Sequence, residues 1–198
     1  MFYTFLISLV FYTYFFSEIN ESKKLLLSGL LLALACMTRP DAVIFYIYAN
    51  FLILIWIFFT HKTFKELIIK LIYFNLPFVI FLLPYLIWKI FYYRDIVPNT
   101  YYVKSAGESY LSQGLYYIWL FFNSYKSTFI SLAALIVTIM ILVNKQSFNN
   151  KITEILNNKP IYTMIIAFGA AVCYLLIFVA RVGGDFMFAR FIIPVLPL

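Results

Sequence analysis

Long uninterrupted apolar segments restrict the fold of this chain more than any other feature. A helix that spans a bilayer needs about 20 apolar residues, with a range of about 17–25. Six runs approach or reach this length: Phe2–Phe16, Leu25–Met37, Ala42–Thr60, Leu67–Tyr93, Thr128–Val143 and Ile161–Ala180. A seventh run begins at Phe191 and is still open at Leu198. The pattern predicts an all-α, polytopic transmembrane helical bundle of six or seven spans.

The runs differ in how well they fit a bilayer. The third, fourth and sixth reach the spanning length outright. The second is short and ends at Thr38–Asp41. It can be interpreted as a tilted span, as a helix in a thinned region of the membrane, or as half of a re-entrant pair. The first resembles a signal-peptide core, but it lacks a basic leading region and a cleavage site, so we interpret it as a span. Residues 1–198 are expected to form a single transmembrane domain.

Composition excludes other classes of protein. Hydrophobic residues make up 65% of the chain and charged residues 12%, whereas a soluble domain carries about 25% charged residues. The formal net charge of +7 is spread thinly between the apolar runs. This distribution argues against a nucleic-acid partner and favours loops beside anionic membrane lipids.

The loops between the runs alternate in chemistry. One set holds Lys and Glu but no Arg or Asp: Ser17–Lys24, His61–Glu66 and Asn144–Pro160. The other set holds all four Arg and all three Asp of the chain: Thr38–Asp41, Arg94–Ser127 and Arg181–Arg190. The sequence therefore predicts two chemically different faces.

The count of cations gives these faces a direction. With Lys70 included, the Lys/Glu face carries eight Lys, against seven cations on the Arg/Asp face. The positive-inside rule favours the Lys/Glu face as cytoplasmic and the Arg/Asp face as extracytoplasmic.

No cofactor motif is present. Cys36 and Cys173 lie inside apolar runs, and His61 is the single histidine. A zinc or haem site and nucleotide binding therefore have no support, while a divalent metal stays open.

The first candidate motif is Thr38-Arg39-Pro40-Asp41. Proline cannot continue a helix, so the motif breaks the chain between two apolar runs. Arg39 and Asp41 must pair or face a polar cavity, because either charge alone near hydrocarbon is costly. The alternative is a solvated turn with Asp41 as a helix N-cap.

The second motif, Tyr92–Lys104, begins where the fourth run ends. Its tyrosines are typical of an interfacial aromatic belt, but they also frame the polar turn Pro98-Asn99-Thr100. Aromatic faces with Asn and Lys donors suit a sugar ring beside a phosphate. The following segment, Gly107–Tyr125, is short for a span and predicts an extracytoplasmic interfacial helix.

The third motif is Arg181–Pro194. Gly183 and Gly184 permit a sharp turn, and Asp185 lies between Arg181 and Arg190. Two guanidinium groups can hold a phosphate or carboxylate through forked hydrogen bonds. The alternative is a salt-bridged loop end.

Together the three motifs resemble the C-type (GT-C) superfamily of polytopic membrane glycosyltransferases. The resemblance rests on Thr38-Arg39-Pro40-Asp41, on Val97–Lys104, and on Val182–Met187 followed by Arg190–Pro197, in that order along the chain. Within the superfamily, the chain is most similar to the bacterial branch that includes mycobacterial arabinofuranosyltransferases and relatives of protein mannosyltransferases. The set indicates the superfamily rather than a particular sugar.

The resemblance implies transfer of a sugar from a polyprenyl-phosphate donor to an extracytoplasmic cell-envelope glycan, lipid or protein acceptor at the bacterial plasma membrane. It implies Arg181 and Arg190 as ligands of the donor phosphate, with Asp185 orienting them or contacting the sugar. Contacts to donor or acceptor are expected from Asn99, Tyr101 and Lys104. Ordering of the loop beneath the site is expected from Arg39 and Asp41.

The resemblance also implies a missing part. Family members commonly carry the key acidic residue in a large loop after their first span, and this chain has no counterpart. We therefore expect a fragment, truncated at both ends, whose catalytic base is unassigned. Two rival interpretations stay open: a transporter or flippase of lipid-linked sugars without transfer chemistry, and a structural membrane subunit.

Overall fold

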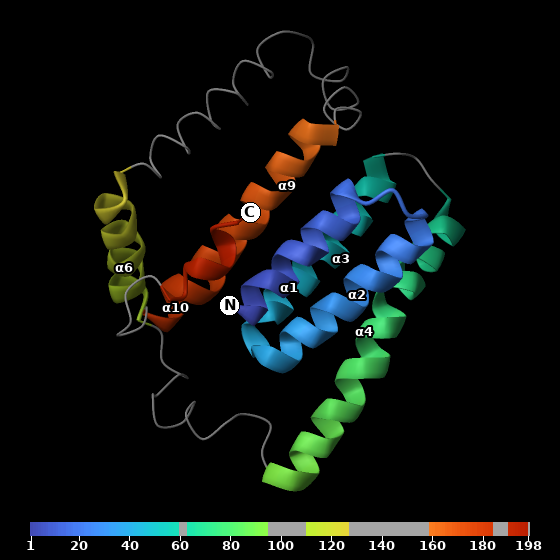
Figure 1. Ribbon diagram of the computed structural model, residues 1–198, viewed down its shortest axis with the longest axis horizontal. Helices are drawn as coiled ribbons and strands as arrows, with labels where there is room; N and C mark the ends of the chain where they lie inside the picture. The colour runs from blue at the N-terminus through green and yellow to red at the C-terminus, as the bar shows by residue number, and fades with distance from the viewer. Residues whose placement is uncertain (60–62, 95–109, 127–158, 184–189, 198) are drawn as a thin grey trace, which may run out of the picture. The chain divides into compact units, whose positions relative to one another are not determined.

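Helices account for every secondary-structure element that the structure describes. The computed structural model describes residues 1–59, 63–94, 110–126, 159–183 and 190–197 (Figure 1). The chain divides into two compact units, one of Met1–Glu108 with Ile193–Leu198 and the other of Ser109–Ile192. The all-α prediction is confirmed over the described residues.

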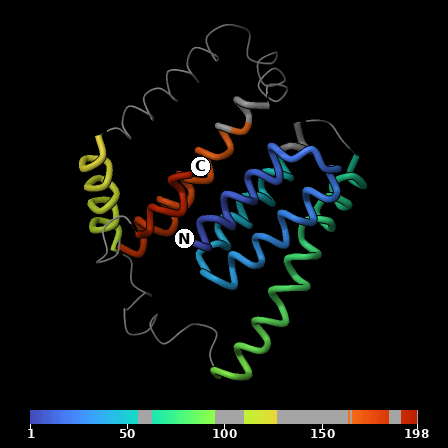
Figure 2. Tube along the Cα trace, in the orientation of Figure 1, coloured from blue at the N-terminus to red at the C-terminus, as the bar shows by residue number. Residues whose placement is uncertain are grey.

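The first unit contains the first four predicted runs as helices. In chain order they are α1 (Phe2–Phe11) with the π-helix η1 (Tyr12–Phe16), α2 (Glu21–Thr38), the 3₁₀ turn η2 (Pro40–Ala42), α3 (Val43–Phe59) and α4 (Phe64–Tyr93). The 3₁₀ turn η4 (Ile193–Val195) packs against α1. The trace in Figure 2 follows α1 and then returns along α2 in the opposite direction.

The short second run forms the centre of this unit. Helix α2 contacts α1, α3 and α4, and eight of its residues are buried. Small side chains allow the close approach, as is typical of helix packing in membranes. A Cβ atom placed on Gly29 would lie 2.1 Å from the carbonyl oxygen of Phe74 and 3.0 Å from Cγ of Pro77 on α4.

Helices α2 and α4 run in the same direction. The side chain of Lys70 forms an ion pair with Glu21, both in the N-terminal part of their helices. Further along, Gly29 meets Phe74, so the contacts advance together on both helices. The Ser17–Lys24 loop and the start of α4 therefore lie at one end of the unit, as the alternation of loops predicts.

Helix α4 continues well past α2. It has 30 residues, which is about 45 Å at a rise of about 1.5 Å per residue. Between Lys70 and Lys89 it carries no charged residue, and that stretch of about 27 Å matches a hydrocarbon core of about 30 Å. Only 11% of the residues in its most apolar stretch are buried.

The second unit is built on one long helix. Its parts are α9 (Lys159–Tyr174), the π-helix η3 (Leu175–Val179) and α10 (Ala180–Val182). Helix α6 (Leu111–Ser124) crosses its end, where a Cβ on Gly114 would lie 2.1 Å from the carbonyl oxygen of Ala180. The predicted short helix over Gly107–Tyr125 is thus present from Leu111.

Two described helices are long and apolar enough to cross a membrane, Phe64–Tyr93 and Ile165–Val182. The third run is also helical, and α3 has 17 residues, which is the lower end of the length that spans a bilayer. The fifth run, Thr128–Val143, lies outside the described residues. Two candidate spans are therefore observed where the sequence predicts six or seven.

The seventh run does not begin as an α-helix. Residues Arg190–Pro197 form turns around the 3₁₀ turn η4. Pro194 and Pro197 disfavour a helix here, because each lacks a backbone N–H and each disfavours the α conformation in the residue before it. The apolar character predicted a helix, and the segment instead forms turns.

Candidate functional site

Arg39 and Asp41 pair with each other at the break between α2 and α3. Nε of Arg39 lies 3.0 Å from Oδ1 of Asp41, and Nη2 lies 3.0 Å from Oδ2. Helix α2 ends at Thr38 because Arg39 adopts an extended conformation before Pro40. The two-point contact is the forked geometry that a guanidinium and a carboxylate prefer.

Tyr3 completes this cluster from the start of α1. Its hydroxyl donates a hydrogen bond of 3.4 Å to Oδ2 of Asp41, and the guanidinium of Arg39 lies 4.9 Å from the centre of its ring. The side chain of Asp41 is only 4% exposed. Burial, a cation–π contact and paired charges make this a fixed structural unit.

The pairing decides between the alternatives for the first motif. Asp41 is buried and pairs with Arg39, so the turn is not the solvated one of the alternative. Two nitrogens of the Arg39 guanidinium contact the carboxylate of Asp41, which suits the expected role of both residues in ordering the loop. Sequence reasoning missed Tyr3, although the start of α1 had to meet the end of α2 if the two are antiparallel.

In the second unit, Tyr110 docks onto the end of α10. Its backbone N–H donates to the carbonyl oxygen of Arg181 at 3.0 Å. Gly183 ends the helix with a φ of 84°, and a Cβ there would lie 2.7 Å from Cβ of Tyr110. The positive φ and the close approach both require glycine, as the third motif predicts for its turn.

Arg181 and Arg190 lie near the same end of this helix. Arg181 belongs to the last turn of α10 and is exposed. The ring of Phe191 meets that of Phe178, one turn before Arg181, with centroids 5.4 Å apart and the planes at 71°. The chain therefore returns to the helix directly after Arg190, whose side chain is also exposed.

Four predicted site residues lie outside the described part of the chain. They are Asn99, Tyr101, Lys104 and Asp185. Their predicted roles stay predictions. Of the eight candidate residues, the structure thus describes Arg39, Asp41, Arg181 and Arg190. It joins the first two directly and brings the other two to one helix end.

Sequence reasoning also missed a polar cluster between α3 and α4. The hydroxyl of Tyr46 donates to the side-chain oxygen of Asn75. The amide of Asn75 donates to Oδ1 of Asn50 at 2.9 Å and to the carbonyl of Leu71 at 2.8 Å. The ring of Tyr46 stacks on Phe78, with centroids 3.5 Å apart. Two asparagines inside apolar runs were the available signal.

A metal site finds no support in the described residues, where no group of three or more His, Cys, Asp or Glu comes together. Comparisons with known proteins also leave the identity open. No protein-family model, curated protein or solved structure matches the chain.

Proposed function

We propose that this chain is part of a membrane-embedded glycosyltransferase that takes a sugar from a polyprenyl-phosphate donor. The observation that carries the proposal is the placement of Arg181 and Arg190 near one end of an apolar helix long enough to cross a membrane. Two exposed guanidinium groups at the end of such a helix are suited to the phosphate of a lipid whose tail lies along it.

The reaction needs both an anion site and a base. An acceptor hydroxyl attacks the anomeric carbon, the bond from that carbon to the phosphate oxygen breaks, and the acceptor proton passes to a carboxylate. Arg181 and Arg190 would stabilise the negative charge that grows on the departing polyprenyl phosphate. Asp185 would hold the guanidiniums in place, and Asn99, Tyr101 and Lys104 would contact donor or acceptor. Asp41 is buried and paired with Arg39, which argues against it as the base.

The orientation in the membrane belongs to the same proposal. Arg39 and Asp41 lie at the end of α2 opposite Glu21 and Lys70, which supports two chemically different ends within the first unit. The positive-inside rule then places the Lys/Glu end in the cytoplasm and the Arg/Asp end outside it. A polyprenyl-phosphate donor at the outer surface fits that placement.

A transfer assay tests the proposal. Membranes containing the protein are incubated with labelled polyprenyl-phosphate sugar, and labelled acceptor is measured. Arg190→Ala and Asp185→Asn should each lower transfer, by about 100-fold for the loss of a group that stabilises a developing charge. Arg94→Ala, which removes another exposed arginine, should leave transfer unchanged.

The same assay separates transfer from transport. The Tyr46–Asn50–Asn75 cluster gives the transporter alternative its best support, because polar groups among apolar helices often mark a translocation path. Movement of intact donor across the membrane without labelled acceptor would establish transport. Wild-type transfer by both the Arg190→Ala and the Asp185→Asn proteins would refute the assigned residues.

A further inference from the structure

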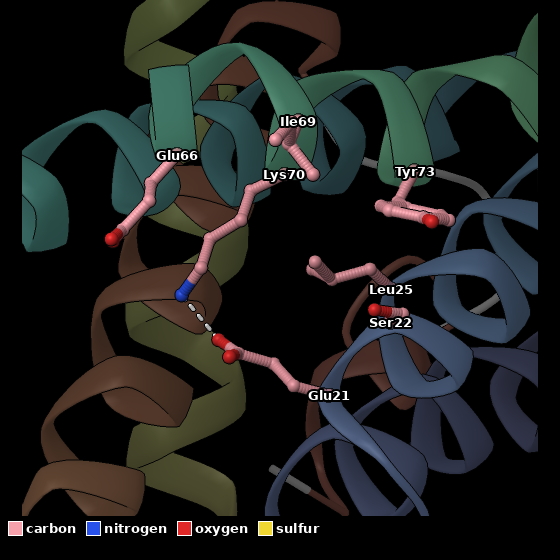
Figure 3. A pocket seen from close by; sticks show the side chains of 7 residues that line it. All are labelled: Glu21, Ser22, Leu25, Glu66, Ile69, Lys70 and Tyr73. Atoms are coloured by element: carbon pink, nitrogen blue, oxygen red, sulfur yellow. Dashed lines mark hydrogen bonds and ion pairs between the residues drawn. The ribbon is translucent and has the colours of Figure 1, made fainter. Parts of the chain in front are cut away.

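A cavity of about 230 Å³ lies between the first turns of α2 and α4, at the opposite end of α2 from Arg39. Its lining combines charged, hydroxyl and apolar side chains: Glu21, Ser22, Leu25, Glu66, Ile69, Lys70 and Tyr73 (Figure 3). It belongs to the first unit alone and shares no residue with the proposed donor site.

Lys70 occupies the middle of this lining. Figure 3 shows its side chain reaching from α4 to the carboxylate of Glu21 on α2. The Lys70 side chain is 13% exposed, whereas that of Glu21 is 60% exposed. Glu66 lies one turn before Lys70 on the same helix. The lining of the cavity thus includes one ammonium group and two carboxylates.

This arrangement of charge selects against simple ions. The two carboxylates repel a phosphate or another plain anion, and a plain cation must compete with Lys70 for the same carboxylates. A ligand with both an ammonium and a phosphate avoids both costs. Its amine can donate to Glu21 and Glu66 while its phosphate accepts from Lys70, and the hydroxyls of Ser22 and Tyr73 supply neutral donors.

We propose that this cavity binds the headgroup of an aminophospholipid, that is, a phosphoethanolamine group on a lipid. The volume is below the range of about 300–1,000 Å³ for drug-sized ligands and suits a small polar group. Leu25 and Ile69 form an apolar wall, and the charge-free stretch of α4 begins directly after Lys70. Acyl chains can therefore follow α4 while the headgroup stays at the membrane surface.

Native mass spectrometry of the purified protein tests this site. The protein in mild detergent is mixed with equal amounts of phosphatidylethanolamine, phosphatidylcholine and phosphatidylglycerol that carry the same acyl chains. We expect phosphatidylethanolamine to be retained at least fivefold more than the other two. The quaternary amine of phosphatidylcholine cannot donate hydrogen bonds to Glu66, and phosphatidylglycerol has no cation.

Matched variants locate the binding. Lys70→Gln and Glu66→Gln should each lower retention at least fivefold. Lys65→Gln and Glu18→Gln change exposed residues outside the lining and should have no effect.

A milder variant covers the case in which loss of the ion pair disturbs folding. The double substitution Ser22→Ala with Tyr73→Phe keeps the charges and removes two hydroxyls, and it should weaken retention about twofold to fivefold.

Three results would overturn the proposal. If phosphatidylcholine were retained as well as phosphatidylethanolamine, the primary amine would not be recognised. If Lys65→Gln lowered retention as much as Lys70→Gln, the lipid would not bind in this cavity. Displacement of the lipid by an equal concentration of soluble phosphoethanolamine would assign the cavity to a free metabolite headgroup and not to a lipid.

Discussion

At the scale of single residues, Arg39 shows how an arginine is accommodated at the end of an apolar helix. Its guanidinium contacts the buried carboxylate of Asp41 and lies over the ring of Tyr3. The sequence could predict that Arg39 and Asp41 must pair or face a cavity, because the cost of an isolated charge is general. It could not predict Tyr3, since that contact depends on how α1 meets the end of α2.

Removal of Arg39 alone should destabilise the protein more than joint removal of both charges. Arg39→Ala leaves the Asp41 carboxylate buried without its cation. We expect a loss of about 2–3 kcal/mol, less than the ~3–5 kcal/mol of fully buried pairs because Arg39 is partly exposed. Adding Asp41→Asn should recover about 1 kcal/mol, since that substitution removes the stranded charge. Unfolding of the detergent-solubilised protein in increasing SDS, followed by circular dichroism, measures both.

The control for this cycle is Arg94→Ala, which removes an exposed arginine at the end of α4. Its unfolding midpoint should equal that of the wild type. If the losses of stability from Arg39→Ala and Asp41→Asn simply added in the double variant, the two residues would not be energetically coupled.

At the scale of elements, the shortest of the six apolar runs, Leu25–Met37, lies in the central helix of its unit. The run is short and ends at Thr38–Asp41, which weakened its prediction as a span, but the helix that contains it has 18 residues and includes Ser28 and Gly29. The same small residues let α4 approach within contact of its backbone. The length of an apolar run does not show whether its helix lies at the centre of a bundle or at its edge. Packing order among helices depends on such contacts, which hydropathy does not contain.

Two adjacent substitutions on α2 should differ in their effect on stability. Gly29→Ala forces a methyl group against the Phe74 carbonyl and should destabilise the protein by about 1–3 kcal/mol. Ser28→Ala removes a buried hydroxyl for which the described residues provide no hydrogen-bond partner, so it should leave stability unchanged or raise it by about 1 kcal/mol. Thermal unfolding in detergent compares them directly. Equal losses in both proteins would show that α2 and α4 do not pack through Gly29.

At the scale of the whole molecule, the sequence predicted helices better than it predicted spans. The helical state of the first four runs and of the sixth is confirmed, because long apolar periodic segments have few other solutions. The start of the seventh run, which contains Pro194 and Pro197, forms turns and not an α-helix. For the site, sequence could indicate which arginines gather near one helix end but not the hydrogen bond from Tyr110 that fixes that end.

The two ends of α4 should be accessible from opposite sides of the membrane. In a protein with Cys36 and Cys173 changed to Ser, single cysteines are placed at Lys65 and at Arg94, both exposed. A membrane-impermeant thiol reagent should label the Arg94→Cys protein in intact cells. It should label the Lys65→Cys protein only after the membrane is opened. The reverse pattern would invert the proposed orientation, and labelling of both in intact cells would show that α4 does not cross.

The Arg39–Asp41 pair also bears on how the protein enters the membrane. In the proposed orientation, the turn between α2 and α3 has to pass through the hydrocarbon during synthesis. Two separated charges would each oppose this passage, whereas a paired guanidinium and carboxylate cross as a neutral unit. The pair forms within the turn around Pro40, because Arg39 and Asp41 are only two residues apart. Helices α2 and α3 are therefore expected to insert together as a hairpin, with the ion pair leading.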